Sequence, residues 1–186
     1  MISGLQIASL LRLAKEQLAY CKTIINYPKT QKKNKYNYSS DIDRFYNNVA
    51  CVFFNDSILI ISSLLDDKDK RVISFKNFTD FFNKKEIKIN ILINQFNSSK
   101  LKEVRDQIIA HQDINNINNQ LPYRNRQGVI NPLLLEIVEN FLDKAIKEFK
   151  EYASECSNPY SEYYFSATEA KKEINAILEK AKPILT

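Results

Sequence analysis

A single histidine, His111, occurs in this 186-residue chain, and it lies in the segment formed by residues 101–113. Histidine is the side chain whose ordinary pKa lets it give and take protons near neutral pH. Acid–base chemistry by an imidazole can therefore take place only at this position. Arg105 stands six residues earlier and adds a permanent positive charge to the same segment.

Residues 99–111 favour one helix, because they contain no glycine or proline. At about 100° per residue, one face of this helix carries an apolar arc, made of Leu101, Val104, Ile108 and Ile109. Arg105 falls inside the arc, and His111 lies near its edge. A buried, unpaired charge is costly, so Arg105 needs a carboxylate, a partner subunit or a bound anion. Alternatively, its stem packs on Leu101 and its guanidinium reaches solvent.

Helical periodicity and capping signals predict the elements that position this segment. The expected helices cover residues 4–26, 40–65, 74–82, 86–96, 99–111, 131–154 and 167–181. Residues 86–96 partly alternate as a strand would, but no partner strand follows, so helix is preferred. Apolar residues recur at helical spacing in the first helix, at Leu5, Ala8, Leu11, Leu18, Cys21 and Ile25. The expected core of the second helix includes Phe45, Val49, Val52, Phe53, Ile60 and Leu64.

Length and composition indicate an all-α protein with one domain, residues 1–186, whose core spans about residues 5–155. Two glycines and five prolines are too few for a turn-rich sandwich or barrel. The formal net charge of +5 is a modest bias towards anionic partners such as RNA. Three scattered cysteines without a C-x-x-C motif are typical of a reducing cytoplasm. The apolar residues 1–13 lack the features of a signal peptide, and no membrane association is expected.

Two polar stretches are predicted loops with possible binding roles. Residues 27–40 interleave lysines with Tyr27, Tyr36 and Tyr38, a pattern compatible with single-stranded nucleic acid. A solvated loop between helices is the preferred interpretation of this stretch. Residues 112–131 are polar and irregular, and Arg124 and Arg126 there either border the site or face solvent.

The sequence lacks the motifs of several common enzyme classes. It has no glycine-rich phosphate loop, no G-x-S-x-G and no H-E-x-x-H. One histidine and scattered cysteines do not predict a zinc site. We therefore expect neither a metal nor a cofactor. A cysteine–histidine pair stays open, although nothing marks any cysteine as activated.

Arg105-Asp106, with His111 following the arginine after five intervening residues, resembles the signature of the HEPN superfamily. The wider string RDQIIAHQD, residues 105–113, resembles the abortive-infection (AbiU-like) branch of that superfamily. The resemblance implies a HEPN-like bundle with up-down antiparallel core helices, dimerising through the helix that carries the motif. Two copies of the motif would then face each other across a cleft, with Arg105 at the subunit interface.

The activity implied by the resemblance is metal-independent cleavage of RNA in phage defence or a toxin–antitoxin system. His111 would act as the acid–base residue, and Arg105 would stabilise charge on the phosphorane. Asp106 would help to orient the site, and Asp113 could accept a hydrogen bond from the imidazole or be a loop residue. Attack by the RNA 2′-hydroxyl would leave a 2′,3′-cyclic phosphate. An antitoxin or another defence protein is a possible partner.

Two alternatives from other classes remain. Some HEPN proteins bind RNA, a nucleotide or a partner protein without catalysis, and a purely structural helical dimer is also possible. His111 would then simply end its helix, where an imidazolium interacts favourably with the helix dipole. HEPN toxins controlled by nucleotide attachment carry a tyrosine shortly after the histidine. Gln112, Asp113 and Ile114 stand there instead, which argues against that control.

Overall fold

The computed structural model describes residues 3–27, 41–65, 73–111, 130–155 and 165–185, without the side chains of residues 41–44, 107–111 and 181–185. These parts of the chain form six α-helices and no strand. The helices are α1 (Gly4–Asn26), α2 (Asp41–Leu64), α3 (Thr79–Asn97), α4 (Lys100–His111), α5 (Pro132–Glu155) and α6 (Thr168–Leu185). The predicted all-α class is confirmed, whereas the HEPN-type arrangement and the dimer stay predictions.

Local capping signals determine where several helices begin. At α1, Gln6 N donates to Ser3 Oγ (3.4 Å), and Ser3 N donates to Gln6 Oε1 (2.9 Å), which is a capping box. At α5, Asn131 Oδ1 accepts a hydrogen bond from Leu133 N at 3.0 Å, and Pro132 occupies the first helical position. The predicted start of α5 is therefore confirmed. Ser40, the predicted cap of α2, lies outside the described residues.

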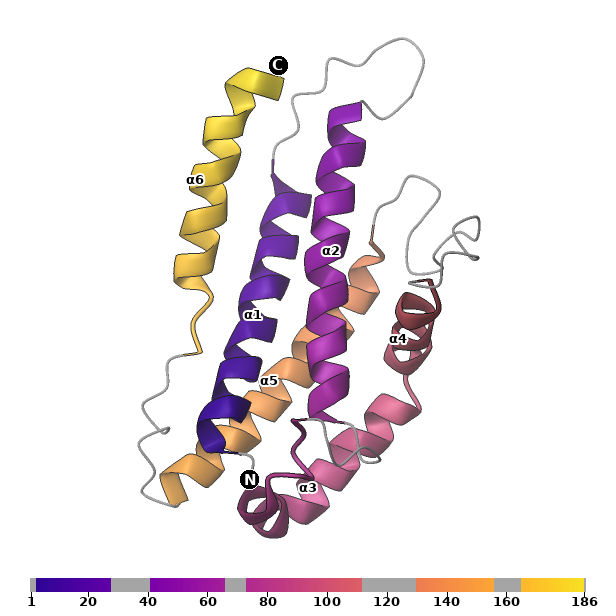
Figure 1. The fold of residues 1–186 in the computed structure, drawn as a ribbon, viewed down its shortest axis with the longest axis vertical. Helices are drawn as coiled ribbons and strands as arrows, with labels where there is room; N and C mark the ends of the chain where they lie inside the picture. Colours follow the sequence, from indigo (N-terminus) through magenta and orange to yellow (C-terminus); the bar gives the residue numbers. More distant parts are fainter. Residues whose placement is uncertain (1–2, 28–40, 66–72, 112–129, 156–164, 186) are drawn as a thin grey trace.

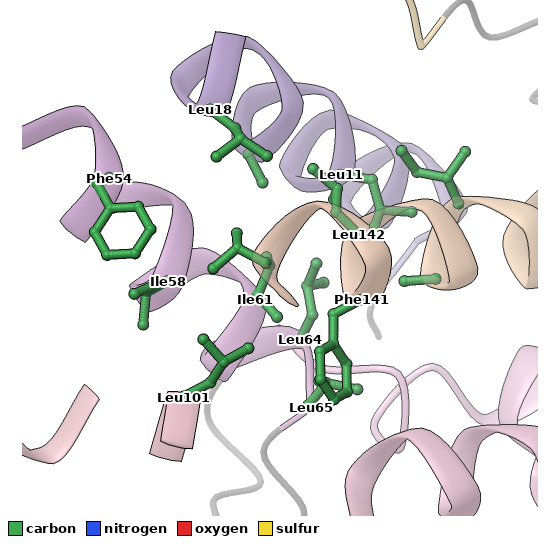
Figure 2. Close-up of a cluster of buried hydrophobic side chains, with 14 of the residues drawn as sticks. Leu11, Leu18, Phe54, Ile58, Ile61, Leu64, Leu65, Leu101, Phe141 and Leu142 are labelled. Atoms are coloured by element: carbon green, nitrogen blue, oxygen red, sulfur yellow. The ribbon is translucent and has the colours of Figure 1, made fainter. Parts of the chain in front are cut away.

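The helices pack around one hydrophobic core. α1 and α2 lie side by side in opposite directions, α5 crosses them, and α6 packs along α1 (Figure 1). One cluster of buried apolar side chains includes residues from all six helices. Its central part joins Leu11 of α1, Ile61 of α2 and Leu142 of α5, with Leu101 of α4 below Ile58 and Ile61 in the view (Figure 2). The site-bearing helix α4 is thus held by the common core.

Helix α3 merges two helices that the sequence predicted separately. The preference for helix over strand at residues 86–96 is confirmed, and the helix before it begins at Thr79 rather than at Ser74. A kink at Lys85 (φ −120°, ψ 18°) replaces the expected gap. The Lys85 side chain is only 8% exposed, and its Nζ lies 2.7 Å from Glu155 Oε1 and 3.5 Å from Glu151 Oε2. The hydrogen bond with Glu155 raises the pKa of Lys85, and burial opposes this effect.

Some predicted core positions are wrong. Phe45 and Val52 of α2 are 55% and 57% exposed. The buried face of α2 is instead formed by Tyr46, Ala50, Cys51, Phe54, Ile58 and Ile61, together with Leu64, which was predicted correctly. Apolar residues surround α2 on nearly every side, so their periodicity does not identify the face that packs.

The same composition gives α2 one further property. Its segment Phe45–Leu64 is long and apolar enough to cross a membrane by length and composition alone, with a mean hydropathy of 1.3. Half of this segment is buried inside the bundle. A core helix of a soluble protein meets the same criterion, so this is weak evidence for a membrane span.

Candidate active site on helix α4

Helix α4 is fixed at its start by Ser99 and along one face by two apolar side chains. Ser99 Oγ accepts a hydrogen bond from Leu101 N (3.2 Å) and donates one to Phe96 O (2.7 Å). This hydroxyl therefore joins the end of α3 to the first turn of α4. Leu101 and Val104 are buried in the core, as the predicted arc requires. The helix consequently has a defined rotation about its axis.

That rotation places Arg105 at the boundary between core and solvent. The Arg105 side chain is 23% exposed. Its Nε and Nη2 both donate to Asp106 Oδ1, at 2.9 Å and 2.6 Å. Its Cζ also lies 5.9 Å from the centroid of the Phe96 ring, within the range of a cation–π contact. The sequence left three possible partners for Arg105: a carboxylate, a partner subunit or a bound anion. The structure provides a carboxylate of the same chain, that of Asp106.

The guanidinium keeps capacity for an anion. It has five N–H groups, and two of them bind Asp106. Both N–H groups of Nη1 and one of Nη2 make no hydrogen bond to the part of the chain that the structure describes. A planar group with adjacent donors suits a phosphate. Arg105 can therefore bind an anion while Asp106 holds its orientation.

His111 is the last residue of α4. Its backbone continues the helix that carries Arg105, whereas its side chain and all of Asp113 lie outside what the structure describes. Ideal helix geometry separates Arg105 from His111 by about 9 Å along the axis and about 120° around it. The structure therefore brings Arg105 and Asp106 together and places the backbone of His111 at the end of the same helix.

A hollow borders this site at the corner between α3 and α4. It has a volume of about 470 Å³ and is lined by Asn97, Ser98, Ser99, Lys102, Glu103 and Asp106. One lysine and two carboxylates give the lining an excess of negative charge. The hollow therefore suits a group that donates hydrogen bonds better than it suits a phosphate. Sequence reasoning did not assign the serine pair a lining role, since only the turn brings it beside Asp106.

A second cleft, of about 390 Å³, lies away from α4 between α1, α5 and α6. Lys15 and Lys22 line it, and each forms an ion pair with a carboxylate of α5. Lys15 Nζ lies 3.0 Å from Asp143 Oδ1, and Lys22 Nζ lies 2.7 Å from Glu139 Oε2. These pairs neutralise much of the positive charge in the cleft. It is best explained as the join between the bundle and α6.

The described cysteines do not provide an alternative nucleophile. Cys21 and Cys51 are both buried. Burial, and then the neighbouring Cys51, raise the pKa of the Cys21 thiol, whereas an activated cysteine needs a lowered pKa. Within the described residues, no three His, Cys, Asp or Glu side chains gather where they could hold a metal ion.

The two polar stretches with possible binding roles, residues 27–40 and 112–131, lie mostly outside the described residues. Of the first stretch only Tyr27 is described. Its hydroxyl donates to Glu179 Oε1 of α6 at 2.9 Å, and its ring centroid lies 6.0 Å from that of Tyr46. Tyr27 thus helps to attach α6 to the bundle. Arg124 and Arg126 also lie outside the described residues.

Comparison with known proteins finds no match to this chain. No protein-family model matches the chain, and no curated protein or solved structure matches it either.

Proposed function

We propose that this protein is a metal-independent endoribonuclease that acts as a homodimer. The RNA 2′-hydroxyl attacks the adjacent phosphorus, His111 transfers the proton, and Arg105 stabilises charge on the phosphorane oxygens. Asp106 fixes the guanidinium in place. The products are a 2′,3′-cyclic phosphate and a free 5′-hydroxyl. The biological role proposed with this activity is phage defence or a toxin function, with an antitoxin or defence protein as a possible partner.

The proposal depends mainly on the geometry of the Arg105 side chain, which lies on the helix that ends at His111, the only histidine in the sequence. Its guanidinium is oriented by Asp106 and Phe96, and it retains N–H groups for an anion. Groups fixed before substrate binds stabilise a transition state without reorganisation. A general acid–base residue contributes about 10²–10⁴-fold to a rate, so the loss of His111 would be easily measured.

The helix geometry also supports a site shared by two copies. Arg105 and His111 differ by about 120° in direction around α4, so their side chains do not converge readily on one phosphorus atom within a single chain. In a dimer, Arg105 of one copy can work beside His111 of the other. On this proposal, the homodimer is needed to complete the catalytic site.

A second candidate is a non-catalytic module that binds RNA, a nucleotide or a partner protein. The observation that favours it is the same Arg105–Asp106 pair, because a guanidinium partly neutralised by a carboxylate has less charge with which to stabilise a phosphorane, whereas binding does not require that stabilisation. The two candidates make opposite predictions about the effect of removing the Asp106 charge.

The test is cleavage of end-labelled total RNA and tRNA in EDTA by wild type, His111→Ala and Arg105→Ala. Lys100→Ala is the matched control, since Lys100 is an exposed cation at the start of the same helix. We expect cyclic-phosphate ends with the wild type and the control, and a loss of at least about 100-fold in both site variants. Equal cleavage by all four proteins would contradict the site assignment. Inactive wild type that still binds RNA would favour the second candidate.

A further inference from the structure

The two serines that line the hollow between α3 and α4 can only accept hydrogen bonds from a ligand. This hollow lies where α3 ends and α4 begins (Figure 1). Ser98 Oγ donates its proton to the backbone, to Asn94 O at 2.9 Å or to Gln95 O at 3.2 Å. Ser99 Oγ donates its proton to Phe96 O at 2.7 Å. Because a hydroxyl has one proton, both serines present oxygen lone pairs to the hollow.

Two carboxylates, those of Glu103 and Asp106, add further acceptors to the lining. Asp106 Oδ1 accepts both bonds from Arg105, whereas Asp106 Oδ2 accepts none from the part of the chain that the structure describes. Glu103 interacts with another group of the chain, but a carboxylate has about four lone-pair sites and can accept further bonds. The side-chain donors of the lining are the Lys102 ammonium and the Asn97 amide. A complementary ligand therefore has several donors beside an acceptor.

Guanine is the RNA base with this pattern. Its N1–H and its N2 amino group are adjacent donors that match the two oxygens of one carboxylate, and its O6 and N7 are acceptors that a lysine can bind. Adenine and cytosine each have a single amino group beside ring acceptors on the same edge, and uracil has a single N–H between two carbonyls. Proteins recognise the edges of unpaired bases in single-stranded RNA by such hydrogen bonds.

We propose that this hollow binds a guanine base next to the phosphate held by Arg105, so that the protein cleaves RNA beside unpaired guanines. Glu103 accepts hydrogen bonds from N1–H and the N2 amino group, and Lys102 donates one to O6. The volume of about 470 Å³ lies within the range of small-molecule sites. The inference rests on the proposed function and adds the base specificity of the same site.

Asp106 connects the hollow to the phosphate site. Its carboxylate holds the guanidinium of Arg105 and also forms part of the wall of the hollow. At about 100° per residue, Asp106 lies between Arg105 and Glu103 around α4. A phosphate at Arg105 and a base attached to it through the ribose can therefore occupy neighbouring positions on this helix.

The charges at the two positions give the nucleotide one orientation. The hollow has two carboxylates and one lysine, so it disfavours a phosphate, whereas the guanidinium of Arg105 suits one. The neutral base therefore enters the hollow, and the phosphate stays at Arg105. These groups all belong to one copy of the chain, so His111 of the second copy can still act on the same phosphate, as the shared site requires.

The first test measures cleavage of uridine-rich RNA oligonucleotides that contain one guanine, inosine or adenine. Inosine lacks the N2 amino group but keeps N1–H and O6. We expect kcat/KM beside guanine to be at least about tenfold higher than beside inosine or adenine. In Glu103→Ala the preference for guanine over inosine should fall below about threefold. Glu86→Ala is the matched control, because Glu86 is an exposed glutamate of α3 outside the hollow, and it should keep the preference.

A second variant separates the two contacts with the base. Lys102→Met removes the donor to O6, which guanine and inosine both have, so kcat/KM should fall by a similar factor beside these two bases. Cleavage beside adenine, which has no O6, should change little. A wild type that cleaves equally beside all of these bases, or a Glu103→Ala protein that keeps the preference for guanine over inosine, would overturn the inference. Circular dichroism checks that each variant is folded.

The third test measures binding without cleavage. Oligonucleotides of the same sequences with 2′-deoxyribose lack the nucleophile and stay intact. At fixed salt concentration, we expect wild type and Glu86→Ala to bind the guanine oligonucleotide with a Kd about tenfold lower than the inosine one. Glu103→Ala should bind the two about equally. Equal Kd values for guanine and inosine with wild type would overturn the inference.

These outcomes can be separated from failure of the proposed nuclease activity. Cleavage that depends on His111 but has no preference for guanine would overturn the inference and support the nuclease. Guanine-selective binding that Glu103→Ala abolishes, with no cleavage by wild type, would support the guanine site and contradict the nuclease. Absence of both cleavage and guanine-selective binding would overturn the two proposals together.

Discussion

The guanidinium of Arg105 and the carboxylate of Asp106, the next residue along α4, are joined by two hydrogen bonds to a single oxygen, at 2.9 Å and 2.6 Å. Neighbouring residues on a helix do not normally face each other. The length of the arginine side chain allows it to fold back across the helix surface, where the Phe96 ring also contacts it. Asp106 is itself 54% exposed, so a ligand can approach the pair from solvent.

Replacement of Asp106 by asparagine separates the two proposed functions. The variant keeps the shape of the side chain but removes its charge, so Arg105 becomes less neutralised and less firmly held. For a nuclease we expect kcat to fall by about tenfold, less than for Arg105→Ala, because the cation is present but poorly oriented. For a binding module we expect tighter RNA binding with unchanged, absent cleavage. Cleavage rates and RNA Kd values at fixed salt would decide between the two.

A mixture of two inactive variants tests whether the site is shared. If Arg105 of one copy works with His111 of the other, a heterodimer of Arg105→Ala and His111→Ala contains one intact site. Random pairing should then restore about a quarter of wild-type activity. Subunits must first be exchanged by brief dissociation, with each variant treated alone as the control. No recovery in a mixture shown by mass spectrometry to contain heterodimers would indicate that each chain acts alone.

The aromatic cluster between α3 and α5 should dominate stability. Phe81 is fully buried, and its ring centroid lies 5.2 Å from that of Phe75 and 5.1 Å from that of Tyr152. Phe81→Ala would leave a cavity and should lower the free energy of unfolding by about 3–5 kcal/mol. Ile87→Ala, at an exposed position of the same helix, should change it by less than about 0.5 kcal/mol. Urea denaturation followed by circular dichroism measures both, and similar effects at the two positions would contradict the packing of α3.

The attachment of α6 should weaken at high pH. Tyr20 of α1 donates a hydrogen bond to Glu173 of α6 at 2.8 Å, and burial together with this bond raises the pKa of Tyr20 from 10.0 to about 12. The folded state therefore keeps a proton that the unfolded state has lost. This contribution to stability is fully present below about pH 10 and is lost as the pH rises towards 12.

Tyr20→Phe removes that contribution, so the difference in unfolding free energy between wild type and variant should shrink over this pH range. Urea titrations from about pH 9 to 12 would show it, with other titrating groups common to both proteins. A difference that stays constant across the range would contradict a raised pKa for Tyr20.

The helices were largely predictable from the sequence, because their signals are local. The Asn131-Pro132 start of α5 and the Ser99 start of α4 depend on groups within a few residues of each other, and both are present as predicted. The end of α1 before Pro28 is equally local, since proline cannot continue the helix. Burial was predictable only where a helix has one apolar side, which is why Phe45 and Val52 of α2 were wrongly predicted to lie in the core.

The candidate site was predictable only in part. The position of Arg105 within the apolar arc follows from the angle per residue, and the burial of Leu101 and Val104 confirms that arc. Its pairing with Asp106 was not predictable, because a helical projection separates adjacent residues by about 100°. The cleft between α1, α5 and α6 depends on contacts between distant segments, for which the sequence carries no local signal.

The exposed side of α2, which includes Phe45 and Val52, carries no lysine or arginine, and this has a practical consequence for any study of this protein by digestion or chemical labelling. Trypsin cleaves after lysine and arginine, and no such residue occurs between Arg44 and Lys68. Limited tryptic digestion therefore gives no information on whether this surface is covered, and amine-directed cross-linkers cannot attach to it. Pepsin cleavage with hydrogen exchange, or a photoreactive residue placed at Val52, would report on it directly.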